Sequence, residues 1–139
     1  MKKVILISCA SKKLRTRAKA ESLYVSPLFK FNLAYARKLN PDAVYILSAK
    51  YGLLGLDQVI QPYEAALNDM STSKIRHWAH KVIKQMKRKI DLKNDKVIFL
   101  AGENYRRFLI PYLRNIQIPL KGRTIGKQLR FLKKALAHE

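Results

Sequence analysis

Short apolar runs alternate along the chain with longer stretches in which apolar residues recur three or four positions apart. The runs are Val4–Ile7, Ala43–Leu47, Lys96–Leu100 and the shorter Ile116–Ile118. Continuous apolar runs of this length are typical of strands buried on both faces of a sheet. The pattern therefore predicts a mainly parallel, four-stranded sheet.

Helical periodicity fills the stretches between these runs. Ser26 and Pro27 have the residue types of a helix cap and first turn, and Pro41 ends that predicted helix at Asn40. Further helices are predicted over 72–89, 103–113 and 125–137, the last with Ile125 among its inward-facing residues. Strands that alternate with helices favour an α/β fold with three layers, and the length of 139 residues favours one domain over 1–139.

Two long segments fit neither pattern. Residues 10–23 are polar and basic, and residues 49–68 contain two glycines and a proline. Each segment follows the carboxyl end of a predicted strand, which is where open α/β sheets bind their ligands. Long loops at such positions often carry function, so we expect the functional site there.

The net charge of the chain indicates what kind of molecule the protein binds. The chain has 29 Lys and Arg against 9 Asp and Glu, a formal net charge of +20, yet 48% of its residues are hydrophobic. That apolar share is too high for a disordered basic tail, and the charge favours a polyanion as partner. No apolar run is long enough for a membrane span or a signal peptide, so we expect a cytoplasmic protein without a membrane partner.

Basic residues gather in three blocks: the first long loop, residues 74–89, and the C-terminal stretch. The second block has seven Lys and Arg and no carboxylate, so it loses the pairings that stabilise an ordinary solvated helix. We expect phosphate contacts from Lys12, Lys13, Lys50, Lys81, Lys84, Arg123 and Lys127. Tyr51 and Tyr105 are candidates for stacking on a base, with half-buried packing as the alternative, and Asn104 for reading a base edge.

Eight of the nine acidic residues divide into two groups, and the ninth, Glu139, is the last residue of the sequence. Asp42, Asp69, Asp91 and Asp95 fall in predicted turns or caps, where Asp is common. Four others lie in the loops after strands or at a helix start: Glu21, Asp57, Glu64 and Glu103. A carboxylate close to bound phosphate lowers the affinity for that phosphate. We therefore expect each of these four residues either to form a salt bridge or to take part in the chemistry. For Glu103, the helix dipole offers a further explanation.

Cysteine and histidine add little chemistry. The single Cys9 follows a predicted strand close to Lys12 and Lys13, so it is either a nucleophile with a lowered pKa or a buried structural residue. His77 and His80 are three apart, and the sequence supplies no third ligand beside them. We therefore predict no metal site and no cofactor.

Several sequence blocks together resemble a known family. These blocks are SCASKK from Ser8, LSAKYGLL from Leu47, IQPYE from Ile60 and GENY from Gly102. They resemble a family of small, largely uncharacterised bacterial and phage domains over nearly the whole chain. The LSAKYGLL and IQPYE blocks are also similar to one in the peroxide-stress YaaA family, which is associated with DNA binding.

The C-terminal half is similar in layout to uracil-DNA glycosylases: a strand, a helix, a short strand, Pro119-Leu120, a glycine-containing loop and a last helix. In that superfamily the proline-containing loop inserts into DNA. The usual histidine of that loop is Ile118 here, so only the layout corresponds.

These observations lead to a hypothesis of a DNA-binding α/β domain that cleaves the N-glycosidic bond of a modified or damaged base. Glu103, Glu64 and Asp57 are its candidate catalytic carboxylates, since a carboxylate can stabilise an oxocarbenium-like sugar or orient water. The alternatives are a non-catalytic basic protein that binds DNA or RNA, and an enzyme that processes nucleotides or nucleosides.

Overall fold

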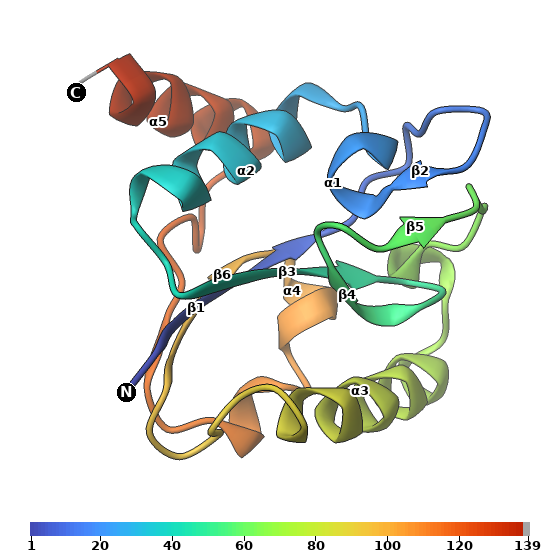
Figure 1. Ribbon diagram of the computed structural model, residues 1–139, viewed down its shortest axis with the longest axis vertical. Coiled ribbons are helices and arrows are strands. Elements are labelled where there is room, and N and C mark those ends of the chain that lie inside the picture. The colour runs from blue at the N-terminus through green and yellow to red at the C-terminus, as the bar shows by residue number, and fades with distance from the viewer. Residues whose placement is uncertain (138–139) are drawn as a thin grey trace.

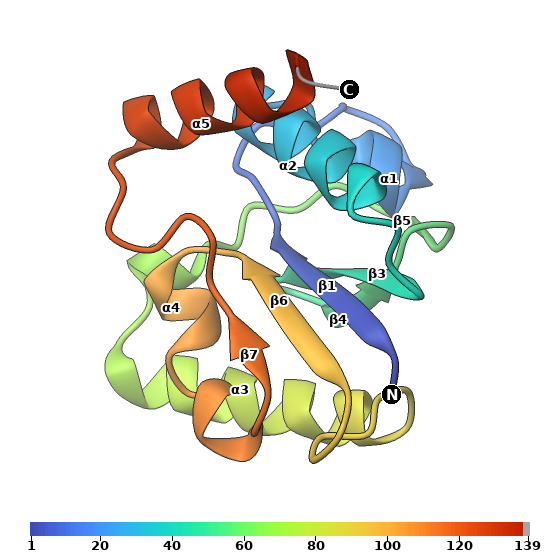
Figure 2. The same ribbon diagram turned by 90° about the vertical axis from the view of Figure 1, so that its left-hand side faces the viewer.

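In a computed structural model that describes residues 1–137, the chain forms three layers, with a five-stranded sheet between two groups of helices (Figures 1 and 2). The strands of this sheet are β1 (Lys3–Ser8), β3 (Ala43–Ser48), β4 (Gly52–Gly55), β6 (Lys96–Leu100) and β7 (Ile116–Gln117). Their order is β4-β3-β1-β6-β7, and β3, β1, β6 and β7 run parallel. The predicted α/β class and its four parallel strands are confirmed.

The fifth strand, β4, is a correction, because the sequence indicated a loop there. It runs antiparallel to β3 and contains only two apolar residues, Leu53 and Leu54, between glycines. Gly52 turns the chain with a φ of 77°, a left-handed conformation that favours glycine. Gln85 then accepts a hydrogen bond from the Leu53 backbone N–H at 2.8 Å, so a distant helix helps to hold the strand.

Two groups of helices cover the sheet, as Figure 2 shows: α2 and α5 lie on one face, and α3 and α4 on the other. The helices are α1 (Ala20–Leu23), α2 (Pro27–Lys38), α3 (Thr72–Lys87), α4 (Glu103–Arg106) and α5 (Ile125–Ala137). Two short 3₁₀ helices are η1 (Leu67–Asp69) and η2 (Ile110–Tyr112). The long loops also pair with each other, through antiparallel β2 (Ala18–Lys19) and β5 (Val59–Ile60).

The helices predicted before Pro41, at 72–89 and at 125–137 are confirmed as α2, α3 and α5. Serine side chains cap two of them: Ser26 accepts from the backbone N–H of Phe29, and Ser71 from that of Lys74, each at 3.2 Å.

The helix predicted over 103–113 is wrong in its length. It stops after Arg106, and a 3₁₀ turn follows at Ile110–Tyr112. Pro111 explains the break, because proline has no backbone N–H and its ring clashes with the carbonyl one turn earlier. Leu109 and Leu113 remain buried, so the broken segment still packs on the sheet.

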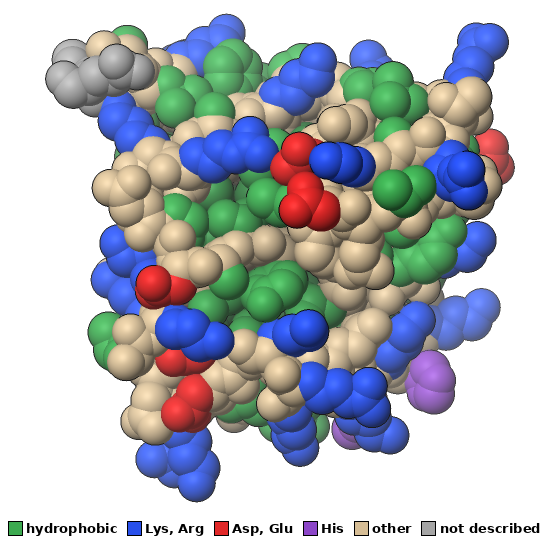
Figure 3. Space-filling view, in the orientation of Figure 1, with side chains coloured by type: hydrophobic (Ala, Val, Ile, Leu, Met, Phe, Trp, Pro, Cys, Tyr) green, Lys and Arg blue, Asp and Glu red, His purple; other side chains and the backbone are tan. Residues whose placement is uncertain are grey.

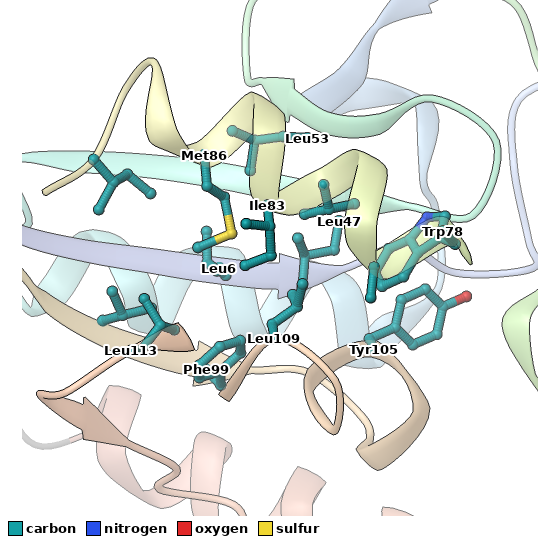
Figure 4. Close-up of a cluster of buried hydrophobic side chains, with 14 of the residues drawn as sticks. Leu6, Leu47, Leu53, Trp78, Ile83, Met86, Phe99, Tyr105, Leu109 and Leu113 are labelled. Atoms are coloured by element: carbon teal, nitrogen blue, oxygen red, sulfur yellow. The ribbon is translucent and has the colours of Figure 1, made fainter. Parts of the chain in front are cut away.

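The core between the sheet and α3 is drawn in Figure 4, where side chains of β1, β3 and β6 meet Trp78, Ile83 and Met86. Trp78 is 6% exposed and donates its indole N–H to the Ser48 carbonyl at 2.8 Å, so it is a packing residue of this core. Among residues 1–137, no helix combines the length and the apolar character needed to span a membrane.

Candidate functional site

A pocket of about 720 Å³ opens where β1 and β6 end, beside the last residues of both strands. From β1 the chain continues to β3 on one side, and from β6 it continues to β7 on the other. The pocket therefore lies at the topological switch point of the sheet, where α/β proteins bind ligands. Its other walls come from α2, from the loop between β5 and α3, and from the segment that enters α5.

One wall of the pocket is apolar, with Leu28, Leu100 and Leu120 among its residues. Ile125, which the sequence predicted to face the core, is 65% exposed and lines this pocket instead. It is the first residue of α5. Asn32 of α2 lies in the same lining and is only 4% exposed.

Three carboxylates line the pocket: Glu64, Asp69 and Glu103. Among residues 1–137, none of them has a cation within ion-pair distance. The two other loop acids are paired outside the pocket, Glu21 with Arg37 at 3.0 Å and Asp57 with Lys19 at 3.9 Å.

The structure therefore divides the predicted catalytic carboxylates: Glu64 and Glu103 share one pocket, and Asp57 lies on an exposed turn. Asp69, predicted to lie in a turn, lies at the end of the 3₁₀ turn η1 and also lines the pocket.

Three cations also line the pocket: Lys13, Arg106 and Arg123. The Lys13 amine lies 4.4 Å from the centre of the Tyr63 ring, and partial burial lowers the pKa of Lys13 although nearby Cys9 and Glu64 act to raise it. Arg106 donates to the Ala101 carbonyl at 2.8 Å, which fixes its guanidinium close to the end of β6. The pocket thus presents both charge signs to a ligand.

A chain of hydroxyl groups runs behind the Lys13 side of the pocket. Ser48 donates to the Tyr63 hydroxyl at 2.7 Å, and the hydroxyls of Tyr63 and Tyr24 lie 2.6 Å apart. Burial raises the pKa of Tyr24 to about 12 and raises that of Tyr63 as well. Both phenols are therefore neutral at physiological pH and serve as hydrogen-bonding groups.

Tyr105 and Cys9 form part of the pocket floor. Tyr105 is 8% exposed, its ring meets Trp78 edge-to-face at 5.7 Å, and burial raises the pKa of its hydroxyl. That hydroxyl lies 3.4 Å from the Cys9 sulfur and accepts from the Leu67 backbone N–H at 3.5 Å. Since its ring is packed in the core, Tyr105 is better placed for hydrogen bonding than for the predicted base stacking.

The remaining predicted contacts lie on the surface. Lys12, Lys50, Lys81, Lys84 and Lys127 are exposed and do not line the pocket. Tyr51 is half-buried with its ring edge-to-face against Tyr63 at 5.5 Å. Asn104 donates to Asn68 of the pocket lining at 2.7 Å. Figure 3 shows Lys and Arg side chains gathered over α3, along the lower part of that face.

Sequence reasoning missed Asn32, Tyr63, Asp69 and Arg106 as site residues. Asn32 left a signal, because it interrupts the buried face formed by Phe29, Leu33 and Ala36 at helical spacing. Asp69 and Arg106 left none, since their approach to the pocket depends on how distant loops fold together.

Within the described range 1–137, no three His, Cys, Asp or Glu side chains come together as metal ligands would. Lys13, Arg106 and Arg123 are the groups that would face an anionic ligand in this pocket.

Comparison with curated proteins finds no match, and neither does comparison with solved structures. One family model matches residues 4–134, which is nearly the whole chain and agrees with the resemblance to an uncharacterised domain family. The chain belongs to DUF6884, a family of unknown function.

Proposed function

We propose that the protein binds DNA and cleaves the N-glycosidic bond of a modified or damaged base held in the strand-end pocket. One observation carries this proposal: Glu64 and Glu103 share a pocket without a salt-bridge partner among residues 1–137, in a chain of net charge +20.

The surroundings of Glu64 and Glu103 favour a catalytic role for these carboxylates over a structural one. In so basic a chain a salt bridge is the ordinary reason to keep an acid, and Glu21 and Asp57 have that reason. Glu64 and Glu103 have no such partner within residues 1–137, and they line a cavity large enough for a nucleotide. Carboxylates at such positions can stabilise a positively charged sugar and orient water.

In the proposed reaction the C1′–N bond breaks, and the base leaves with the bonding electron pair and takes up a proton. Water forms the new bond to C1′ and gives up a proton, which leaves an abasic sugar. Glu64 and Glu103 share the two roles of stabilising the sugar cation and orienting the water. The base reaches the pocket by leaving the stack, at a cost of a few kcal/mol that is lowest for damaged bases.

The charge distribution supports DNA as the polyanion. Exposed Lys and Arg side chains cover α3, and Lys13, Arg106 and Arg123 continue positive charge into the pocket. The similarity of the LSAKYGLL and IQPYE blocks to the DNA-associated YaaA family points the same way.

The decisive experiment is incubation of the protein with DNA duplexes and single strands that carry a panel of modified bases, followed by detection of abasic sites. We expect cleavage of at least one base, and a loss of about 100-fold or more in Glu64→Gln and Glu103→Gln. Asp57→Asn is the matched control, because it removes an equal charge outside the pocket and should retain full activity.

Equal activity in the wild type and in both glutamate variants would contradict the catalytic role. Release of no base from the whole panel, with DNA binding intact, would favour the non-catalytic binding protein instead.

DNA binding itself is tested by its salt dependence. If the basic surface makes about six phosphate contacts, affinity should fall roughly 10³-fold between ~50 and ~200 mM salt. The measurement is a fluorescence anisotropy titration of a labelled duplex at several salt concentrations. An affinity that stays flat across this range would rule out phosphate neutralisation as the source of binding.

A further inference from the structure

Asn32 has an unsatisfied polar atom in the pocket wall. Its side chain lies in the middle of α2, is 4% exposed and lines the pocket. Among residues 1–137 its buried carbonyl oxygen, Oδ1, has no hydrogen-bond partner, and no other buried side-chain nitrogen or oxygen there shares that condition. Such an atom destabilises the folded protein, because it lost its contact with water and gained nothing in return.

The surroundings of Asn32 make this cost unusual. It sits on the buried face of α2 with Phe29, Leu33 and Ala36, where an apolar side chain would pack without penalty. Elsewhere in the core, polar groups are paired: Ser48 and Trp78 both have partners within 2.8 Å. A ligand that supplies the missing donor explains why an amide occupies this position.

The chemistry of the wall indicates what that ligand offers. Leu28, Leu100 and Leu120 line the same pocket and suit a flat apolar ring. An amide accepts through its oxygen and donates through its nitrogen, so its complement has a donor and an acceptor on adjacent atoms. Nucleobases combine a flat ring with that edge.

We infer that Asn32 is the residue that recognises the base, through paired hydrogen bonds to one edge of a ring seated against the apolar wall. This inference rests on the proposed function and adds the part of the substrate that the pocket selects. In this arrangement Glu64 and Glu103 act on the sugar, and the cations that contact the phosphate are Lys13, Arg106 and Arg123.

The test measures binding of free bases, which needs neither DNA nor catalysis. Four free bases are titrated into the wild type and into Asn32→Leu: uracil, cytosine, adenine and hypoxanthine. The substitution replaces the amide with an apolar group of similar shape. Toluene is titrated as a control ligand, because its ring lacks a polar edge. We expect at least one base to bind the wild type, and Asn32→Leu to bind it tenfold or more weakly, since tenfold corresponds to about one hydrogen bond.

Asn32→Leu should also melt about 2 to 6 °C higher than the wild type without ligand, because the unsatisfied oxygen is gone. Asn115→Leu is the control, since Asn115 lies next to β7 at the opposite end of the sheet and outside the pocket lining. It should bind bases as the wild type does.

Equal base affinity in the wild type and Asn32→Leu, or binding of toluene as tight as that of any base, would overturn the assignment. Binding of none of the four bases would overturn it too. DNA binding and abasic-site formation are measured separately, so the proposed function can survive a negative result here. Asn32→Ala repeats the comparison if the leucine variant folds poorly.

Discussion

The two ends of the central sheet treat their polar groups in opposite ways. At the amino ends of the strands, Asp95 accepts from the backbone N–H groups of Lys2 and Asp91 at 2.8 and 2.9 Å, and Asp42 accepts from that of Lys3 at 2.7 Å. These carboxylates have defined hydrogen-bond donors.

At the carboxyl ends, three carboxylates line an open cavity instead. Glu64, Asp69 and Glu103 line it without an ion pair within residues 1–137, and the Asn32 oxygen lacks a partner there. Unsatisfied polar groups lower stability, so they tend to persist where they serve a function. The polar groups at the amino end of this sheet are therefore tied into the fold, while several of those around the cavity at the carboxyl end have no such partner within residues 1–137.

The largest effect that separates the two ends is expected for Asp95→Ala. Two backbone N–H groups lose a charged acceptor, so the free energy of unfolding should fall by about 2 to 4 kcal/mol. Urea unfolding measures this loss, and DNA affinity measured on the folded variant should stay that of the wild type. If Asp95→Ala is as stable as the wild type, the polar groups at the amino end do not stabilise the fold as inferred.

The same aspartate makes the amino end sensitive to acid. Hydrogen bonds from backbone N–H groups, that of Lys2 first, lower the pKa of Asp95 below its ordinary 3.8. The stability it contributes is therefore present above that value and is lost as pH falls through the lower pKa of the folded state. Asp95→Ala should lack this part of the acid dependence.

The carboxyl end should instead be sensitive to alkali, with a somewhat smaller effect. Burial raises the pKa of Tyr24 from 10.0 to about 12, so the folded state holds that proton more tightly than the unfolded chain. Stability should therefore decline as pH rises from 10 towards 12, by roughly 2 to 3 kcal/mol for this residue. Urea unfolding at pH 8, 10 and 11 measures the decline.

Tyr24→Phe is the comparison variant for that measurement. It should show a shallower alkaline decline than the wild type, because the group that titrates is absent. An identical pH dependence in both proteins would show that Tyr24 does not keep its proton in the folded state.

The smallest effect on stability is expected for the pocket carboxylates. Glu64→Gln and Glu103→Gln remove charges that make no ion pair within residues 1–137, so the free energy of unfolding should change by no more than about 0.5 kcal/mol. Urea unfolding beside Asp95→Ala gives the direct comparison. A loss of several kcal/mol in either variant would mean that these side chains support the fold.

Much of the fold could be predicted from the sequence, because its signals are local. Fully apolar runs marked β1, β3 and β6, and the spacing of apolar residues marked α2, α3 and α5. The prediction failed where local signals were weak or misleading. β4 depends on pairing with β3 and on Gln85 from α3, and the helix predicted over 103–113 ignored the geometry that Pro111 imposes.

The candidate site could be predicted only in part. The rule that ligands bind at the carboxyl ends of parallel strands directed attention to the strand ends after β1 and β6, where the pocket lies, and to Glu64 and Glu103. It could not separate them from Asp57, because all three follow strands in the sequence. The distinction comes from the tertiary structure, in which Asp57 lies on an exposed turn outside the pocket and pairs with Lys19.

By itself, the sequence determined the α/β class, the parallel strands, the principal helices and the basic blocks, since each follows from periodicity or composition within a short segment. Only the tertiary structure decided which acids are paired, that Tyr105 is packed in the core and that Asn32 lines the pocket while its buried oxygen has no partner within residues 1–137. Those outcomes depend on residues far apart in the chain, and a hydrogen-bond partner or a cavity exists only once the layers have packed.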